Sequence, residues 1–213
     1  VEGLDALYGV HVVPNLPVGT VGIRRGCLTA AAGELEIRVQ GEGGHGARPH
    51  QSVDAVWLAA RVITELQQTI ARRLDALQPV VISFGKVEGG RAFNVIADQV
   101  RLLGTVRCLD LQQHAQLPAW IDETVQGICA SGGGKAVVNY RCIAPPVHND
   151  PQLTTLLERC AVECLGRDKV LPVEQCSGNS PQLYPLHWHR FPAPSRQSRL
   201  AAERAAADPD SAP

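Results

Sequence analysis

The chain has 213 residues, of which 45% are hydrophobic, 19% charged and 4% aromatic, and its formal net charge is −1. This length and hydrophobic fraction provide for one sizeable core or two small ones. The near-neutral charge and the shortage of aromatic side chains exclude a nucleic-acid groove, an anionic membrane surface and a base-stacking platform as the main binding surface.

The seven cysteines are odd in number, include no Cys-x-x-Cys pair and follow no signal peptide. These features favour reduced thiols, so we expect a cytoplasmic protein. No apolar run approaches the roughly 20 residues that a membrane-spanning helix needs. The chain contains no methionine, even at position 1, and we therefore expect it to be a fragment of a longer protein.

The first predicted elements are strands. Leu7 to Val13 is apolar and β-branched, which indicates a buried strand that ends at Pro14. Residues 18–23 indicate a short strand, and residues 34–40 alternate apolar and polar side chains as in a half-buried strand. Residues 41–50 then place glycines around one histidine, with a second histidine behind a proline. Glycine lets the backbone approach a ligand closely, so this loop is a candidate site.

The first predicted helix covers residues 52–73, where apolar side chains recur at spacings of three and four. Ser52 is expected to be its N-cap, and Asp54 complements the positive N-terminal dipole. The side chains expected on the buried face are Val53, Val56, Trp57, Ala60, Ile63, Leu66 and Ile70.

Two strands and a second helix are expected next. Residues 79–87 are rich in β-branched side chains, and residues 100–108 alternate apolar with polar positions, as strands do. Asp110 resembles the first residue of a capping box, and its helix is expected to run to about Ala130. Pro118 inside that helix predicts a kink or a late start, since proline removes a backbone donor.

A strand at residues 135–141 completes the order β-α-β-β-α-β. This is the ferredoxin-like arrangement, in which two helices cover one face of an antiparallel sheet. The flanking strands and an amphipathic helix at residues 151–166 suit a second, α/β domain. We therefore predict an α+β protein in which the ferredoxin-like domain is inserted into an incomplete α/β domain.

The expected domain boundaries follow from this order. Residues 1–30 and 143–175 are assigned to the incomplete α/β domain, and residues 31–142 to the inserted domain. Residues 176–213 are dominated by Pro, Ser, Arg and Ala without apolar periodicity, so we expect a divergent, disordered tail.

Four side chains are candidates for chemistry. His11 ends a predicted strand, where a sheet edge can hold a site, but a buried neutral histidine fits the same pattern. His45 is framed by glycines and suits proton transfer or metal binding, although it also fits an exposed loop histidine. Asn94 is equally explained as a turn residue, and Arg107 as a surface charge.

These segments together resemble the metal-dependent amidohydrolases and carboxypeptidases that include aminoacylase, hippurate hydrolase and the indole-acetyl-amino-acid hydrolases. Gly9 to Pro14, Gly43 to Asp54, Phe93 to Ile96 and Gly104 to Arg107 occur in the order found in that family. The resemblance runs from residue 1 to about residue 175. It implies a catalytic α/β domain with two zinc or manganese ions, and a ferredoxin-like lid domain that forms a homodimer.

The resemblance also implies roles for the four candidates. His11 matches a metal ligand. His45 matches a lid histidine that reaches the partner subunit's active site and donates to the developing oxyanion. Asn94 and Arg107 match residues that bind the substrate, Asn94 near its carboxylate. The implied reaction is hydrolysis of the amide of an N-acyl amino acid or small peptide by metal-activated water, with a glutamate as base.

The chain departs from the family pattern in two places. The metal-binding cluster and the Glu-Glu pair that would precede Val1 are absent, and the acidic segment and final metal-ligand histidine expected after Gln175 are not matched. We therefore expect an inactive fragment that binds no metal tightly, from a frameshifted or truncated gene. The alternative is a non-catalytic dimerisation module. An RNA-recognition module is disfavoured because no strand is rich in aromatic residues.

Overall fold

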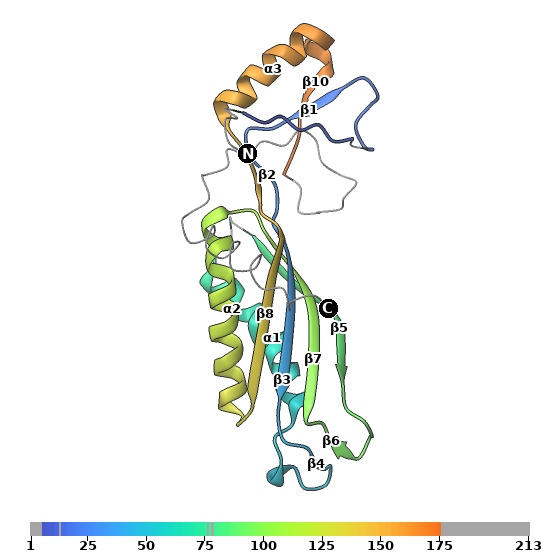
Figure 1. The fold of residues 1–213 in the computed structure, drawn as a ribbon, viewed down its shortest axis with the longest axis vertical. Coiled ribbons are helices and arrows are strands. Elements are labelled where there is room, and N and C mark those ends of the chain that lie inside the picture. The colour runs from blue at the N-terminus through green and yellow to red at the C-terminus, as the bar shows by residue number, and fades with distance from the viewer. Residues whose placement is uncertain (1–5, 13, 76, 78, 176–213) are drawn as a thin grey trace, which may run out of the picture.

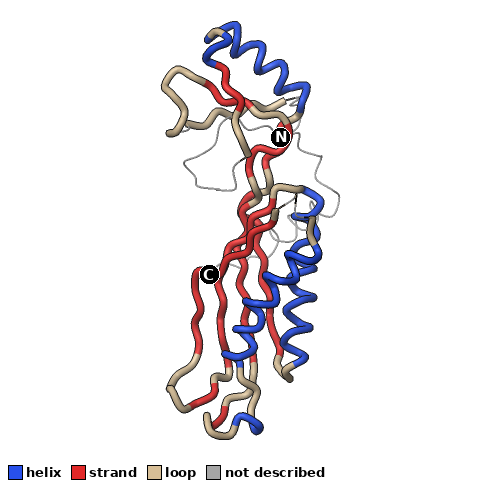
Figure 2. Tube along the Cα trace, turned by 180° about the vertical axis from the view of Figure 1, so that it is seen from behind, coloured by secondary structure: helices blue, strands red, loops and turns tan. Residues whose placement is uncertain are grey.

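The computed structural model describes residues 6–175, except residues 13, 76 and 78. Its central feature is an antiparallel four-stranded sheet with two helices on one face (Figure 1 and, from behind, Figure 2). The strands lie in the order β5 (Val80–Gly89), β7 (Gln99–Cys108), β3 (Ala32–Gln40) and β8 (Lys135–Ala144). The helices are α1 (Ala55–Arg73) and α2 (Leu111–Ser131).

This sheet confirms the predicted fold class. The chain order β3-α1-β5-β7-α2-β8 is β-α-β-β-α-β, and every pairing in the sheet is antiparallel. Each helix connects two strands that are parallel to each other and separated by a third, which is the split βαβ topology of the ferredoxin-like fold. The molecule is therefore an α+β protein.

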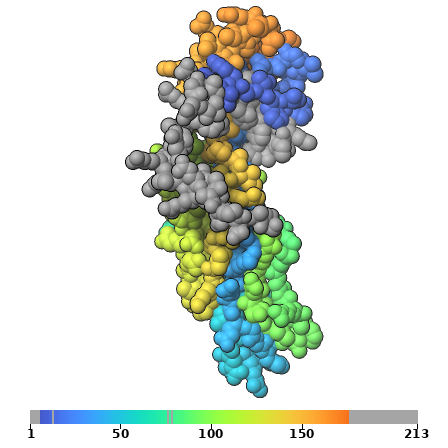
Figure 3. Space-filling view, in the orientation of Figure 1, coloured from blue at the N-terminus to red at the C-terminus, as the bar shows by residue number. Residues whose placement is uncertain are grey.

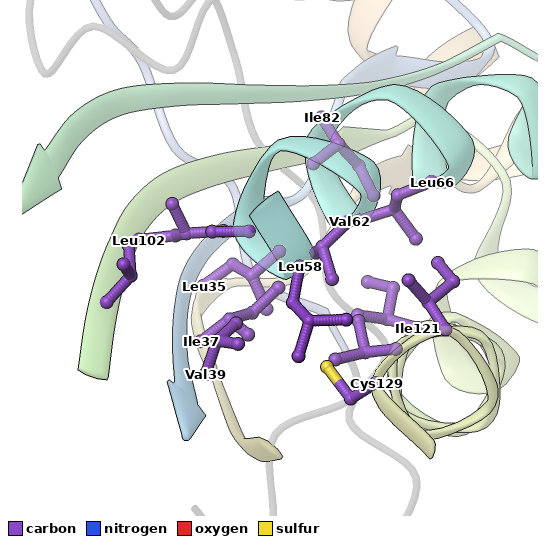
Figure 4. Close-up of a cluster of buried hydrophobic side chains, with 14 of the residues drawn as sticks. Leu35, Ile37, Val39, Leu58, Val62, Leu66, Ile82, Leu102, Ile121 and Cys129 are labelled. Atoms are coloured by element: carbon purple, nitrogen blue, oxygen red, sulfur yellow. The ribbon is translucent and has the colours of Figure 1, made fainter. Parts of the chain in front are cut away.

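The core lies between the sheet and the helices (Figure 4). On β3, Leu35, Ile37 and Val39 are fully buried, whereas the alternate positions Glu34 and Arg38 are exposed. Successive side chains of a strand point to opposite faces, so an alternating sequence buries one face only. The helical side chains that meet this face include Leu58, Val62, Leu66, Ile121, Val125 and Cys129.

The first helix begins later than predicted. Asp54, not Ser52, is its N-cap: the Asp54 carboxylate accepts hydrogen bonds from the backbone N–H groups of Val56 at 2.9 Å and Trp57 at 3.1 Å. The Ser52 hydroxyl donates instead to the carbonyl of Pro49 at 3.2 Å, within a short 3-10 turn, η1 (Pro49–Gln51). Both residue types are good caps, and the intervening turn decides between them.

The buried face of α1 also differs from the predicted one. Val56 and Trp57 are each 50% exposed, and the Arg61 guanidinium lies 5.0 Å from the centre of the Trp57 ring. The buried positions of α1 are Ala55, Leu58, Ala59, Val62 and Leu66. Two sets of residues in this segment have helical spacing. The set that contains two alanines is buried, because small side chains let the helix approach the sheet closely.

The second helix starts where its cap predicts. The Asp110 carboxylate accepts a hydrogen bond from the backbone N–H of Gln113 at 2.7 Å, and the helix continues through Pro118 to Ser131. The late start expected from Pro118 is therefore not seen. Proline costs one backbone hydrogen bond within a helix, and burial of Leu117 and Ile121 on either side offsets this loss.

A narrow two-stranded ribbon leads out of the sheet. Strand β2 (Gly26–Thr29) pairs antiparallel with β9 (Val147–Asn149). In Figure 1 this ribbon connects the sheet to a small unit in which β1 (Val21–Ile23) pairs parallel with β10 (Val170–Pro172). The chain segments that precede and follow the sheet domain in the sequence therefore pair with each other outside it, as an inserted domain requires.

Helix α3 (Pro151–Leu165) lies over this small unit, followed by a 3-10 turn, η2 (Arg167–Lys169). Thr154 is the one buried side chain that α3 contributes within the described part of the chain, and Leu156 and Leu165 are each 46% exposed. The apolar side of α3 thus lies largely open in this structure.

The predicted buried strand from Leu7 to Val13 is wrong. Residues 6–12 form no regular secondary structure, and Val10 and Val12 are each 81% exposed. An apolar run becomes a buried strand only when a neighbouring strand pairs with it, and no pairing strand is present among the residues that the structure describes. The predicted tail at residues 176–213 lies outside the described residues. None of the described helices is long and apolar enough to cross a membrane.

Candidate functional site

The glycine-rich loop is held against the segment that carries Asn94. Strand β4 (Gly44–His45) pairs antiparallel with β6 (Val95–Ile96), with His45 opposite Val95. The backbone N–H of Gly46 donates to the carbonyl of Asn94 at 2.8 Å. A Cβ atom on Gly46 would lie 2.9 Å from that carbonyl oxygen, so only glycine permits this approach. His45 and Asn94 are thereby brought to one place.

The imidazole of His45 has a defined orientation. Its Nδ1 accepts a hydrogen bond from the backbone N–H of Ala47 at 3.1 Å. A neutral imidazole with Nδ1 as acceptor carries its proton on Nε2. The exposed His45 ring therefore presents an N–H donor, which is the group that stabilises a developing oxyanion.

A hollow of about 370 Å³ lies between these two segments. Figure 3 shows them side by side at the end of the molecule opposite α3. The hollow is lined by Gly43, Gly44, His45, Arg91, Asn94, Val95, Ile96, Ala97 and Asp98. His45 and Asn94, both predicted from the sequence, thus share one hollow.

Arg91 was missed by the sequence analysis although it lines the same hollow. Its guanidinium Nη2 lies 3.7 Å from the Asp98 carboxylate, and the two side chains are 84% and 58% exposed. The available signal was its position directly after Gly89 and Gly90, three residues before Asn94, but the pairing of β4 with β6 was needed to interpret it.

Arg107 lies at the other end of the sheet. Strand β7 runs from Gln99, next to β6, to Cys108, whose carbonyl accepts from the backbone N–H of Ala31 beside the ribbon. Arg107 lies eight steps along the strand from Gln99, or about 26 Å at a rise of about 3.3 Å per residue. The Arg107 guanidinium donates to the Thr105 hydroxyl at 2.5 Å and the Val106 carbonyl at 3.0 Å. Within one chain, the structure therefore does not bring Arg107 to His45.

His11 lies in the small unit beyond the ribbon. It lines a hollow of about 340 Å³ together with Leu16, Pro17 and residues 18–22. Its Nδ1 lies 2.8 Å from the carbonyl oxygen of Val12. Among the described residues, no group of three or more His, Cys, Asp or Glu side chains is arranged to hold a metal ion. The residues that the structure describes therefore do not fit a dinuclear metal centre by themselves.

The buried cysteines are not poised as nucleophiles. Burial raises the pKa of the Cys108 and Cys129 thiols above the ordinary value. The same effect raises the pKa of Cys27 and outweighs the opposing effect of the Arg24 guanidinium, and the Asp110 carboxylate adds a smaller increase. The thiolate is the reactive form of cysteine, so these three side chains remain protonated near neutral pH.

The geometry defines a class of protein. A ferredoxin-like domain, inserted through a two-stranded ribbon, presents an imidazole donor at its far tip, and β5 and β8 are the outer strands of its sheet. This is the architecture of an inserted accessory domain, and the described residues do not form a self-contained active site around that imidazole.

The comparisons agree with this class. Residues 29–132 match the peptidase dimerisation domain. The chain is 49% identical over 201 residues to a probable hydrolase from Synechocystis sp., covering 93% of this chain and 50% of that protein. It is 39% identical over 151 residues to the N-acetyldiaminopimelate deacetylase of Geobacillus sp., covering 71% of this chain and 40% of that enzyme.

A solved structure supports the same assignment. A dinuclear metal-binding peptidase of the M20 family from Bacillus subtilis is 28% identical with a TM-score of 0.63, covering 79% of this chain and 41% of the peptidase. Residues 29–132 are therefore a peptidase dimerisation domain, and the chain is similar over most of its length to a probable hydrolase and a deacetylase and to a solved peptidase of the M20 family. It spans about half the length of the curated relatives that it matches.

Proposed function

We propose that this chain supplies the lid domain and part of the catalytic domain of a metal-dependent amidohydrolase that cleaves the amide bond of N-acyl amino acids. The deacetylase relative from Geobacillus acts on an N-acetyl amino acid by its name, which supports this substrate class. The lid is assigned to residues 31–142 and the catalytic pieces to residues 1–30 and 143–175, in a cytoplasmic protein.

The observation that carries the proposal is the presentation of His45. Its Nε2–H faces away from the Ala47 amide that occupies Nδ1, and the paired loops hold the ring at the tip of the lid. A donor fixed before the reaction stabilises negative charge on a carbonyl oxygen without a reorganisation cost. In this proposal His45 donates to the scissile carbonyl, and the side-chain amide of Asn94 holds the substrate beside it.

A second copy of the chain is needed to complete the site. His45 and Arg107 lie at opposite ends of one sheet, whereas β7 brings Arg107 to the ribbon that leads toward His11. If the twofold axis of a homodimer pairs the two sheets edge to edge and antiparallel, the tip of one lid points toward the ribbon end of the partner. We therefore assign His45 and Asn94 to one subunit's lid, and Arg107 and His11 to the other side of the same site.

The metal chemistry belongs to the whole parent enzyme. A pair of divalent ions, zinc or manganese, would activate the attacking water and polarise the amide when bound. His11 is the one ligand candidate that the described chain offers, so we propose that the 213-residue chain is inactive alone. The purified chain with added Zn²⁺ or Mn²⁺ is expected to leave hippurate and N-acetyl amino acids intact. Measurable hydrolysis would overturn this part of the proposal.

The role of His45 is tested in a chimera. Residues 31–144, which include all four strands of the sheet, replace the corresponding domain of the Geobacillus deacetylase, and deacetylation is measured with and without His45→Ala. We expect the substitution to lower kcat by about 10²- to 10³-fold, as loss of an oxyanion donor does. His50→Ala, which removes a neighbouring exposed histidine, is the matched control and should stay near the parent rate. Equal activity of the two variants would exclude His45 from the reaction.

The match to a peptidase dimerisation domain also favours a second candidate function, a non-catalytic dimerisation module. Light scattering tests the assembly that the two functions share: both predict a dimer of the purified chain, and a monomer would argue against both. A dimer whose His45→Ala chimera keeps full activity would favour the module.

A further inference from the structure

We propose that Arg91 makes the hollow at the lid tip a subsite for the free carboxylate of the N-acyl amino acid. This inference rests on the substrate class proposed above but concerns a residue to which no role has been given. Arg91 lines the hollow together with His45 and Asn94. Among the described residues lining it, Arg91 is the one permanent cation.

The guanidinium of Arg91 is available to a ligand. Its ion pair with Asp98 is long at 3.7 Å, and both side chains are well exposed. An exposed ion pair of this kind contributes little, because water and salt screen it. A substrate carboxylate can form two parallel, charge-assisted hydrogen bonds with a guanidinium. Such a ligand therefore competes effectively with Asp98 for Arg91.

The loop that carries Arg91 is anchored to the sheet. Strand β5 ends at Gly89, where a Cβ atom would lie 2.8 Å from the carbonyl oxygen of Gln99 on β7, so the two backbones are in close contact. Gly90 follows with φ +79°, a left-handed conformation that favours glycine. Arg91 follows this turn directly, and it lines the hollow together with Asn94.

The donors around the hollow complement an acid. A carboxylate only accepts hydrogen bonds, and the guanidinium, the Asn94 amide and the Nε2–H of His45 all donate. The hollow is thus suited to a substrate whose carboxylate meets Arg91 and Asn94 while its amide carbonyl meets His45. Val95, Ile96 and Ala97 add apolar surface to the lining.

The test measures binding to the 213-residue chain by amide NMR, with hippurate and with hippuramide, in which an uncharged carboxamide replaces the carboxylate. We expect hippurate to shift the resonances of Gly44, His45 and Asn94, and hippuramide to bind at least about tenfold more weakly because it lacks the charge-assisted contact. Arg91→Gln should remove this preference for hippurate, and Arg91→Lys should retain part of it.

Two variants serve as controls. Arg48→Gln removes the same charge from an exposed position that does not line the hollow, and it should leave the preference unchanged. Asp98→Asn removes the competing carboxylate and should strengthen hippurate binding. Three results would each overturn the subsite: equal resonance shifts with hippurate and hippuramide, an equal loss of the preference for hippurate in the Arg48 and Arg91 variants, or no resonance shift at the lid tip. The binding assay requires neither metal nor hydrolysis. The subsite can therefore fail this test while His45 remains essential in the chimera, and the subsite can pass it while His45 proves dispensable.

Discussion

The backbone N–H of Gly46 donates to the carbonyl oxygen of Asn94 at 2.8 Å, so the histidine loop and the asparagine loop form one unit. A Cβ atom at position 46 would lie 2.9 Å from that oxygen and 3.2 Å from its carbon. Both neighbours are backbone atoms, which cannot move away without breaking the hydrogen bond. We expect Gly46→Ala to separate the loops and to speed amide hydrogen exchange at position 46 by about tenfold or more, equivalent to about 1.4 kcal/mol of local stability.

The control for this substitution is Gly85→Ala. A Cβ atom on Gly85, in β5, meets nothing within 4 Å, so exchange at the lid tip should remain at the parent rate. Unchanged exchange in the Gly46 variant would show that this bond does not hold the loops together.

The cap of α1 gives a prediction about stability. Asp54 accepts from two backbone N–H groups at the helix start, and Asp54→Ala leaves both without this partner. Loss of an N-cap typically costs about 1 kcal/mol, so the melting temperature should fall by several degrees. Asp54→Asn should recover most of the loss because asparagine also caps well. Ser52→Ala is the matched control and should change stability by less than about 0.5 kcal/mol; a larger effect of Ser52 would contradict the assignment of the cap.

One glycine inside α2 and one at its C-cap are expected to change stability in opposite directions when replaced by alanine. Gly127 is exposed inside the helix, where a Cβ atom meets nothing within 4 Å, so Gly127→Ala should stabilise the fold by about 0.5–1 kcal/mol. At Gly132, just after the helix, a Cβ atom would lie 2.6 Å from the Leu58 side chain and 2.7 Å from the Trp57 ring. Gly132→Ala should therefore destabilise, by about 1–3 kcal/mol. Chemical denaturation of the two variants measures both effects, and the same sign for both would contradict the packing at Gly132.

Period-two and helical patterns predicted the fold well where local sequence and burial agree. Strand β3 alternates strictly, and its side chains divide between core and solvent as expected. The helical conformation of α1 was predicted correctly. Its buried face was not, because Val56 and Trp57 also lie at helical spacing although they are half exposed. The choice between two such stripes depends on which side chains fit against the sheet, and that is a tertiary property.

The candidate site, too, was only partly predictable from the sequence. Glycines around His45 pointed to a site because they permit close backbone approach, and the approach to Asn94 is observed. Arg91 could not be found in this way, since an arginine after two glycines is also typical of any exposed turn. Its relation to His45 arises from the pairing of two-residue strands, β4 with β6, which are too short to be recognised by a sequence pattern.

Burial of His114 predicts that stability depends on pH on the acid side. The imidazole Nε2 lies 3.1 Å from the Tyr140 hydroxyl, and desolvation lowers the pKa of His114. The unfolded chain, with an ordinary pKa of about 6.5, then binds the proton more tightly than the folded chain. Stability should therefore fall as the pH drops below about 6.5, down to the lowered pKa. His114→Gln should flatten this part of the curve, and an unchanged slope in this variant would assign the dependence to other groups.

Tyr140 predicts a separate loss of stability on the alkaline side. Burial raises its pKa from 10.0 to about 12, with smaller contributions from neighbouring thiols. Between these two values the unfolded chain has released the phenolic proton and the folded chain still holds it. The folded state then binds more protons, so the free energy of unfolding decreases as the pH rises through this window. Denaturant titrations at several pH values between 9 and 12, on the parent and on Tyr140→Phe, measure the effect. The variant cannot ionise, so the parent should lose more stability over this range, and parallel curves would show that Tyr140 ionises equally in both states.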